Sequence, residues 1–196
     1  MDRLLLTYPQ QLRGTSLQLA EGERPPKLGE EWKITRASRD LGYGQEAFRA
    51  ASDALWTWQV HANAGVRPRL GNGEAPLGWW EGQQVRLRIG PIRSACEIVH
   101  AERAAEGAQG WRTAVAYGTL QGHVEKGEEC FIVETVPGIT NARSDALVRG
   151  TCVAFSQPAW RVARLAKPLA SFGQDMITQR YLAAMARAAG RGVASP

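Results

Sequence analysis

The strongest constraint in this sequence is a run of five strand-like segments joined only by short turns. In the first of them, Val85, Leu87 and Ile89 alternate with Arg86 and Arg88, which is the pattern of a half-buried strand. Successive strands joined by turns pair antiparallel, whereas parallel pairing requires a crossover of about a dozen residues or more, usually a helix. No helical crossover separates these segments, so the pattern predicts an antiparallel sheet. The segments are 85–89, 92–103, 111–120, 129–136 and 146–156.

Two amphipathic helices are expected on either side of this run. In the first, over residues 45–61, apolar side chains recur at helical spacing. In the second, Ile177, Tyr181 and Met185 repeat every fourth residue, Gly190 ends the helix, and residues 190–196 form a frayed tail. The first third of the chain also contains short strand-like pieces at 4–8 and 16–19, and residues 65–78 read as a long connection.

The economical way to bury both helical stripes is a curved antiparallel sheet that grips the long C-terminal helix, an α+β fold. A sheet of five or more strands twists too strongly to stay flat. With 196 residues, 44% of them hydrophobic, the chain is long enough for one domain over residues 1–196. Whether the inward-facing side chains fill the interior completely or leave room for a ligand stays open. These side chains include Trp111, Tyr117, Phe131, Phe155, Tyr181 and Met185.

Charge, cysteines and apolar runs restrict the class of protein. The 24 Lys and Arg against 19 Asp and Glu give a net charge of +5, but the arginines are scattered and no known nucleic-acid-binding motif occurs. A nucleic-acid partner is therefore not expected, and a modest anion-attracting surface is the simpler interpretation. Without a membrane-spanning run or signal peptide, we expect a soluble, cytoplasmic protein. Cys96, Cys130 and Cys152 are expected to be buried, reduced thiols. No pattern predicts the oligomeric state.

The densest group of polar residues lies between residues 117 and 129. His123 and Glu125 share one face if this piece is extended, and a carboxylate beside an imidazole would raise the pKa of the histidine. Such a pair can act as general acid and base, with Glu128 as a further candidate, or supply two ligands to a metal. Zinc needs three or four ligands, so no metal is expected. No phosphate loop or dinucleotide-binding fingerprint occurs, so no cofactor is expected either. The alternative is a structural hairpin whose carboxylates cap turn amides and pair with arginines.

Tryptophan is abundant, and seven indole rings suit either a core or the lining of an apolar site. Trp79 and Trp80 are adjacent. In an extended chain their rings point to opposite faces, so one of them can be exposed or lie at the mouth of a pocket.

A group of short motifs is spread along the chain: Tyr117-Gly118-Thr119-Leu120, Gly122-His123, Glu125, Gly127-Glu128-Glu129, Ala154-Phe155-Ser156 with Pro158, Gln174, Tyr181, and Leu41-Gly42 with Gly44 before the first helix. Together these motifs resemble the uncharacterised DUF1990 family, also called UPF0548. The resemblance covers nearly the whole chain and implies an element order similar to the START-like, or Bet v 1-like, helix-grip superfamily. In that superfamily a curved antiparallel sheet grips a long C-terminal helix around an apolar cavity, so the resemblance favours a cavity over a filled core.

Three functions follow as hypotheses. The first is binding of a hydrophobic or amphipathic small molecule between the sheet and the C-terminal helix, by the six inward-facing residues named above. The second is a hydrolase, cyclase or isomerase that uses His123 with Glu125 or Glu128 at the rim of the cavity. The third is weak binding of nucleic acid or other anions by the basic surface.

Overall fold

The structure, a computed structural model, describes residues 4–23, 25, 28–107, 110–136, 146–159 and 167–193. Within these ranges the helical elements are η1 (Gln10–Leu12), α1 (Thr15–Ala20), α2 (Gly44–Trp56), α3 (Gln59–Asn63) and α4 (Lys167–Val193). The strands are β1 (Lys33–Tyr43), β2 (Val66–Arg69), β3 (Gln84–Ile89), β4 (Ile92–Gly107), β5 (Gly110–Thr119), β6 (Glu125–Val136) and β7 (Leu147–Pro158).

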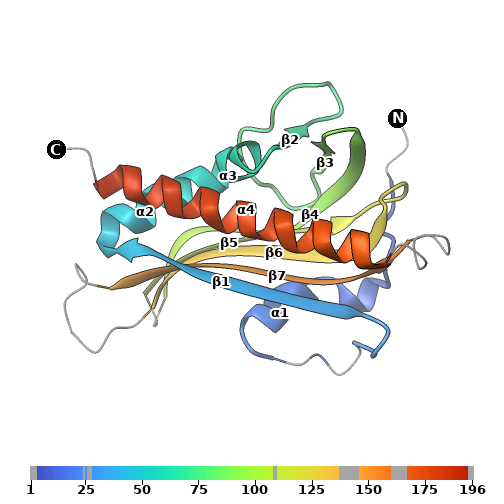
Figure 1. Cartoon of the computed structure of the whole chain (residues 1–196), viewed down its shortest axis with the longest axis horizontal. Coiled ribbons are helices and arrows are strands. Elements are labelled where there is room, and N and C mark those ends of the chain that lie inside the picture. Colours follow the sequence, from blue (N-terminus) through green and yellow to red (C-terminus); the bar gives the residue numbers. More distant parts are fainter. Residues whose placement is uncertain are drawn as a thin grey trace.

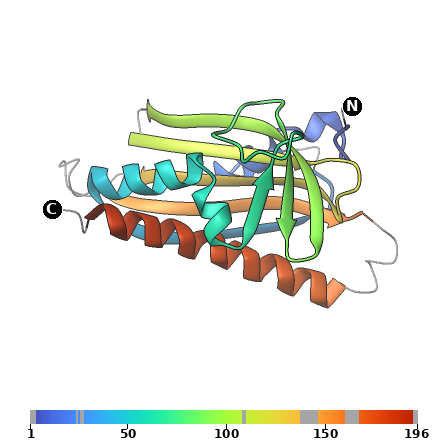
Figure 2. The ribbon, with the colours of Figure 1, turned by 90° about the horizontal axis from the view of Figure 1, so that it is seen from above.

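These strands form one curved antiparallel sheet in the order β1-β7-β6-β5-β4-β3-β2. Helices α2, α3 and α4 lie on one face, which we call the inner face, and α1 lies on the opposite, outer face (Figure 1). Figure 2 shows α4 running along the length of the sheet beside α2. The predicted α+β fold class, a curved antiparallel sheet with a long C-terminal helix against it, is confirmed.

Strand alternation decides which face each side chain occupies. In β6, Phe131 and Val133 join the core between the sheet and the helices, whereas Cys130 and Ile132 pack on the outer face with the N-terminal segment. Burying a phenylalanine side chain fully contributes roughly 1.5–3 kcal/mol, so both faces of the central strands stabilise the fold. This two-sided burial explains why the central strands are almost continuously apolar.

Two strands were not predicted. β1 is an edge strand whose residues are mostly exposed, with only Leu41 fully buried, so its sequence lacks a clear apolar alternation. β2 has only four residues and lies inside the segment that the sequence indicates as a connection. It contains Pro68, which an edge strand tolerates.

Two other predictions about local structure are wrong. Residues 16–19 lie in helix α1 rather than in a strand, because a short apolar piece cannot distinguish the two and tertiary contacts at the helix start decide. Residues 4–8 make only an isolated bridge, between Leu6 and Leu120.

The predicted helix over 45–61 is interrupted, and the last helix is longer than predicted. Trp58 adopts a left-handed backbone conformation (φ 63°) that separates α2 from α3. Its indole N–H donates to the Gly78 carbonyl (2.9 Å) and its ring stacks on Trp79 at 3.7 Å between centroids, so aromatic packing offsets the backbone cost. Helix α4 continues past Gly190 to Val193, and residues 194–196 of the expected tail lie outside the described residues.

The cysteine and tryptophan predictions are confirmed. Cys96, Cys130 and Cys152 are free and buried. Trp79 is buried at 1% exposure and Trp80 is 52% exposed. Among the described helices, none is long and apolar enough to span a membrane.

Candidate functional site

Four of the six residues predicted to contact a ligand lie together in the inner core. Tyr117 comes from β5, Phe131 from β6, and Tyr181 and Met185 from α4, and all four are buried. The Phe131 ring centroid lies 5.5 Å from that of Tyr117 and 5.0 Å from that of Tyr181. The sheet and α4 therefore meet through an aromatic cluster.

Of the other two predicted residues, one lies at the edge of the same core. Trp111, at the start of β5, is partly buried against the inner core, where its ring centroid lies 5.7 Å from that of Phe48 of α2. Phe155 lies on the outer face, where its ring contacts Tyr8 and Trp32 edge-on. The structure thus separates Phe155 from the other predicted ligand contacts by the thickness of the sheet.

A carboxylate reaches the aromatic cluster from the inner face of β6. The Tyr117 hydroxyl donates to Oε2 of Glu129 at 2.9 Å, and Tyr117 is also hydrogen-bonded to Tyr181. Part of the surface of Glu129 remains accessible to solvent, while Tyr117 and Tyr181 are buried. Burial raises the pKa of Glu129 to about 7; the hydrogen bond from Tyr117 lowers it and the charge of Glu125 raises it. Glu129 is therefore close to half ionised at neutral pH.

His61 of α3 lies among the same rings. Its ring centroid is 4.8 Å from those of Trp58 and Tyr181, 4.9 Å from Phe131 and 5.9 Å from Tyr117. The side chain is fully buried, and neither ring nitrogen has a hydrogen-bond partner in the described part of the chain. Burial lowers the pKa of His61 to about 3, so the imidazole is neutral at pH 7. Buried polar atoms without partners are uncommon and require an explanation.

The predicted pairing of His123 with a carboxylate is not the contact that forms. The backbone N–H of Glu125 donates to Nδ1 of His123 at 3.0 Å. Burial lowers the pKa of His123 to about 4, and the backbone hydrogen bond opposes this only in part. The expectation that a carboxylate raises the pKa of His123 is therefore wrong. Burial raises the pKa of Glu125, against the effect of the nearby Lys33 charge.

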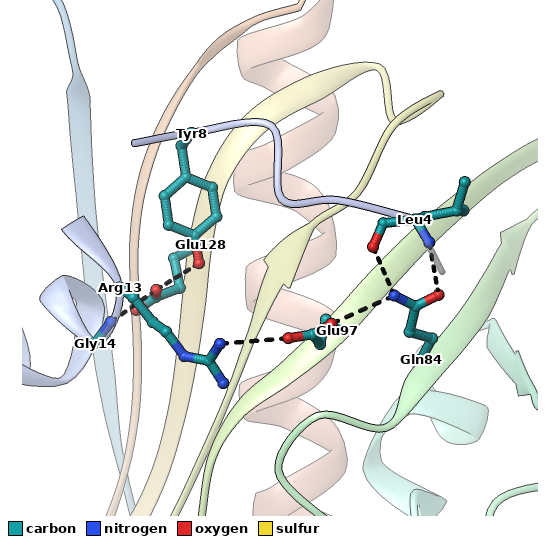
Figure 3. A network of polar contacts seen from close by, with 7 residues as sticks. All are labelled: Leu4, Tyr8, Arg13, Gly14, Gln84, Glu97 and Glu128. Atoms are coloured by element: carbon teal, nitrogen blue, oxygen red, sulfur yellow. Dashed lines mark hydrogen bonds and ion pairs between the residues drawn. The ribbon is translucent and has the colours of Figure 1, made fainter. Parts of the chain in front are cut away.

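Glu128 points to the outer face, where it meets Tyr8 and Gly14 of the N-terminal segment (Figure 3). One of its oxygens accepts from the Tyr8 hydroxyl (2.7 Å) and the Gly14 amide (3.0 Å). The other accepts from the Ser16 amide (3.1 Å) and hydroxyl (2.6 Å). The carboxylate caps amides at the start of α1, as the structural alternative expects, although these amides belong to another segment rather than to its own hairpin. The prediction that Glu128 lies at the rim of an interior site is wrong.

A second buried carboxylate extends this attachment of the N-terminal segment. Glu97 of β4, 4% exposed, pairs with Arg13 at 3.4 Å. Glu97 also accepts from the Gln84 amide, which donates to the Leu4 carbonyl at 2.7 Å (Figure 3). The outer-face carboxylates therefore have structural partners. Within the described ranges, no three His, Cys, Asp or Glu side chains gather to hold a metal ion.

Comparison with known proteins places the chain in a family. The model of "Domain of unknown function (DUF1990)" matches residues 15–184. The chain belongs to the DUF1990 family. A relative from Dictyostelium discoideum, named "UPF0548 protein", is 25% identical over 166 residues, which cover 79% of this chain and 71% of the relative.

Two solved structures are similar to this DUF1990 chain. The hypothetical protein jhp0584 from Helicobacter pylori has a TM-score of 0.55 at 9% identity and covers 95% of this chain and 97% of its own. Ara h 8.0201 has a TM-score of 0.41 at 7% identity and covers 84% of this chain and 99% of its own. At 9% identity, the similarity to the Helicobacter pylori protein concerns the fold alone.

Sequence reasoning missed the two polar residues of the inner aromatic cluster in this DUF1990 chain. Glu129 carried a usable signal, because it lies two residues before Phe131 and therefore on the same face of an extended strand. His61 carried none, because it lies at the end of a helical stripe and its neighbours come from distant segments. We call Glu129, Tyr117, Tyr181 and His61 the Glu129 site.

Proposed function

We propose that the protein binds a hydrophobic or amphipathic small molecule between the inner face of the sheet and α4, with the polar end of the molecule at the Glu129 site. The supporting observation is a carboxyl group that accepts a hydrogen bond from Tyr117 among buried aromatic rings, on a residue that is itself only partly buried. Ligand sites combine an apolar lining with a few convergent polar groups, and this combination is found here.

The unpartnered nitrogens of His61 support the same proposal. A buried polar atom without a hydrogen bond costs about 1–3 kcal/mol, so its presence among aromatic side chains is unfavourable for stability alone. A ligand with a hydroxyl or amide group would satisfy such an atom. His61 is neutral and offers one donor and one acceptor.

The chemistry of Glu129 restricts the polar end of the ligand. Tyr117 occupies one oxygen, and the remaining lone pairs accept hydrogen bonds. Because the pKa of Glu129 is raised to about 7, the site holds a neutral acid as readily as an anion at neutral pH. A hydroxyl or a protonated amine suits this carboxyl group, whereas a carboxylate or phosphate end would be repelled by Glu129 in its ionised form.

Two tyrosines provide a matched test. Tyr117→Phe removes a buried hydroxyl that donates to Glu129 on the inner face, and Tyr8→Phe removes one that donates to Glu128 on the outer face. Native mass spectrometry of freshly purified protein would detect a co-purified molecule, and titration with the uncharged apolar fluorophore N-phenyl-1-naphthylamine would measure a site that is empty. We expect Tyr117→Phe to weaken retention of the molecule by about five- to tenfold.

The control variant, Tyr8→Phe, shows whether a loss of binding is specific to the inner face. Tyr8→Phe should lose comparable stability and keep the wild-type binding. If the wild-type protein carries no molecule and does not bind the fluorophore, or if both variants weaken binding equally, the proposed ligand site is wrong.

The raised pKa of Glu129 also favours a second candidate, proton transfer to or from the bound molecule. A general acid or base works best when its pKa lies near the working pH. This candidate predicts conversion of the co-purified molecule with an inflection near pH 7 that Glu129→Gln removes. If the molecule binds and is recovered unchanged, the protein is a binding protein only.

A further inference from the structure

The register of β2, β3 and β4 gathers five arginines that are far apart in the sequence. Arg67 lies opposite Arg88, and Arg88 lies opposite Arg93, so these three form a row across the strands. Arg69 lies opposite Arg86 in the next row. We call these five residues the arginine face.

All five side chains are exposed on the outer face of the sheet. Residues that alternate with them, such as Val66, Val85 and Leu87, belong to the inner core. The described residues provide no carboxylate partner for Arg67, Arg69, Arg88 or Arg93, although Arg69 donates to the Pro68 carbonyl and Arg88 to the Gly90 carbonyl. Most of the N–H groups of these four arginines are therefore directed to solvent.

This arrangement is unfavourable for folding alone. Like charges directly opposite each other on neighbouring strands are destabilising. Here the Arg67–Arg88 and Arg88–Arg93 pairs place three guanidinium groups in one row. A bound anion removes the repulsion, so the arginine face has the charge of a binding surface.

We propose that the arginine face binds the sugar-phosphate backbone of a nucleic-acid strand. Neighbouring strands lie about 4.8 Å apart and alternate residues in one strand about 6.8 Å apart, so the guanidinium groups form a grid whose longer spacing is comparable to that of successive phosphates. All five positions are arginine and none is lysine, and the planar guanidinium matches two phosphate oxygens at once. Backbone contacts of this kind carry no base specificity.

The same face is less suited to a membrane surface. Peripheral binding to lipid combines basic residues with apolar side chains that insert between the headgroups. The β3 and β4 residues that share this face beside the arginines are Gln84, Ala95 and Glu97, and none carries a large apolar side chain; one exposed leucine, Leu5, lies in the N-terminal segment next to Gln84. The observations therefore favour nucleic acid over anionic lipid, independently of the ligand proposed for the inner face.

The salt dependence of binding tests this proposal. Fluorescence anisotropy of a labelled single-stranded RNA of about 20 nucleotides, measured at several salt concentrations, should give a slope of log K against log salt of about −3 for four or five phosphate contacts. The variant R67A/R88A/R93A should flatten the slope by about 2 units and weaken binding by about 100-fold near 0.1 M salt. R67K/R88K/R93K keeps the charge, loses the forked geometry and should lie between these two.

The control variant R39A/R49A/R180A removes three exposed arginines from β1, α2 and α4 and changes the net charge equally. We expect it to bind almost as the wild type does. The proposal is overturned if both triple alanine variants weaken binding equally, or if the wild-type protein does not bind the RNA at low salt. It is also overturned if the arginine face is needed for vesicles containing phosphatidylserine and not for the oligonucleotide.

Discussion

Replacing Glu129 with glutamine isolates the free energy that this carboxyl group costs when it is ionised. Burial raises its pKa from 4.5 to about 7 in the folded protein. A tenfold difference in proton affinity corresponds to about 1.4 kcal/mol, so ionising the folded protein costs about 3 kcal/mol relative to the unfolded chain. The glutamine side chain does not titrate and can still accept the hydrogen bond from Tyr117.

The direction of the pH dependence follows from the raised pKa. The unfolded chain releases this proton near pH 4.5, and the folded protein keeps it until about pH 7. The stability that the protonated carboxyl group confers is therefore present below pH 4.5 and lost as the pH rises through 7. Between these values, Glu129→Gln should gain up to about 3 kcal/mol relative to the wild type.

His61, which is fully buried, and His123, which is partly buried, also contribute to the pH dependence of stability, so the variant is compared with the wild type. Burial lowers the pKa of His61 to about 3 and that of His123 to about 4. Their contribution has the opposite sign, because it is present above pH 6.5 and lost as the pH falls. It overlaps the Glu129 window but is common to the wild type and the variant, so it cancels in their difference.

The assay is urea denaturation of both proteins at constant ionic strength between about pH 4 and pH 8. We expect the difference in free energy of unfolding to increase through this range in favour of Glu129→Gln and to level off above pH 7. A difference that stays constant, or one that increases in favour of the wild type, would show that the carboxyl group is not held in the low-dielectric environment described here.

Three further changes test the roles of single residues. Glu128→Ala leaves four donors without an acceptor and should lower the free energy of unfolding by about 3–5 kcal/mol in urea titrations, against less than about 1 kcal/mol for Glu134→Ala on the same strand. His61→Phe removes two unpartnered nitrogens and should raise stability at pH 7 by about 1 kcal/mol or more, reduce its decline below pH 6.5, and weaken ligand retention in native mass spectra. Gly127→Ala places a Cβ against the Phe155 carbonyl at φ +141° and should cost more than about 2 kcal/mol by thermal unfolding; unchanged stability would contradict the close β6–β7 approach.

The antiparallel sheet and the C-terminal helix were predictable because their apolar periods are long and regular. The edge strands β1 and β2 were not, since an edge strand has few buried positions and leaves a weak pattern. Phe155 was assigned to the inner face because the apolar run of β7 has no polar alternation that reveals its direction. Both faces of β7 are buried, one by α4 and the other by the N-terminal segment, so composition cannot distinguish them.

The position of the candidate site depends on which of two adjacent glutamates faces the inner side of the sheet. Glu128 and Glu129 are adjacent and chemically identical, yet one fastens the N-terminal segment on the outer face and the other meets the aromatic rings on the inner face. Side chains alternate between the two faces of a strand, so the face of each glutamate is known once the face of one neighbour is known. Phe131 is that neighbour, and it faces inward. His61 could not be found in this way, because its surroundings combine α3, β5, β6 and α4 and exist only after these elements have packed. A residue whose role depends on one strand can be inferred from that strand, whereas a residue whose role depends on four elements requires the fold.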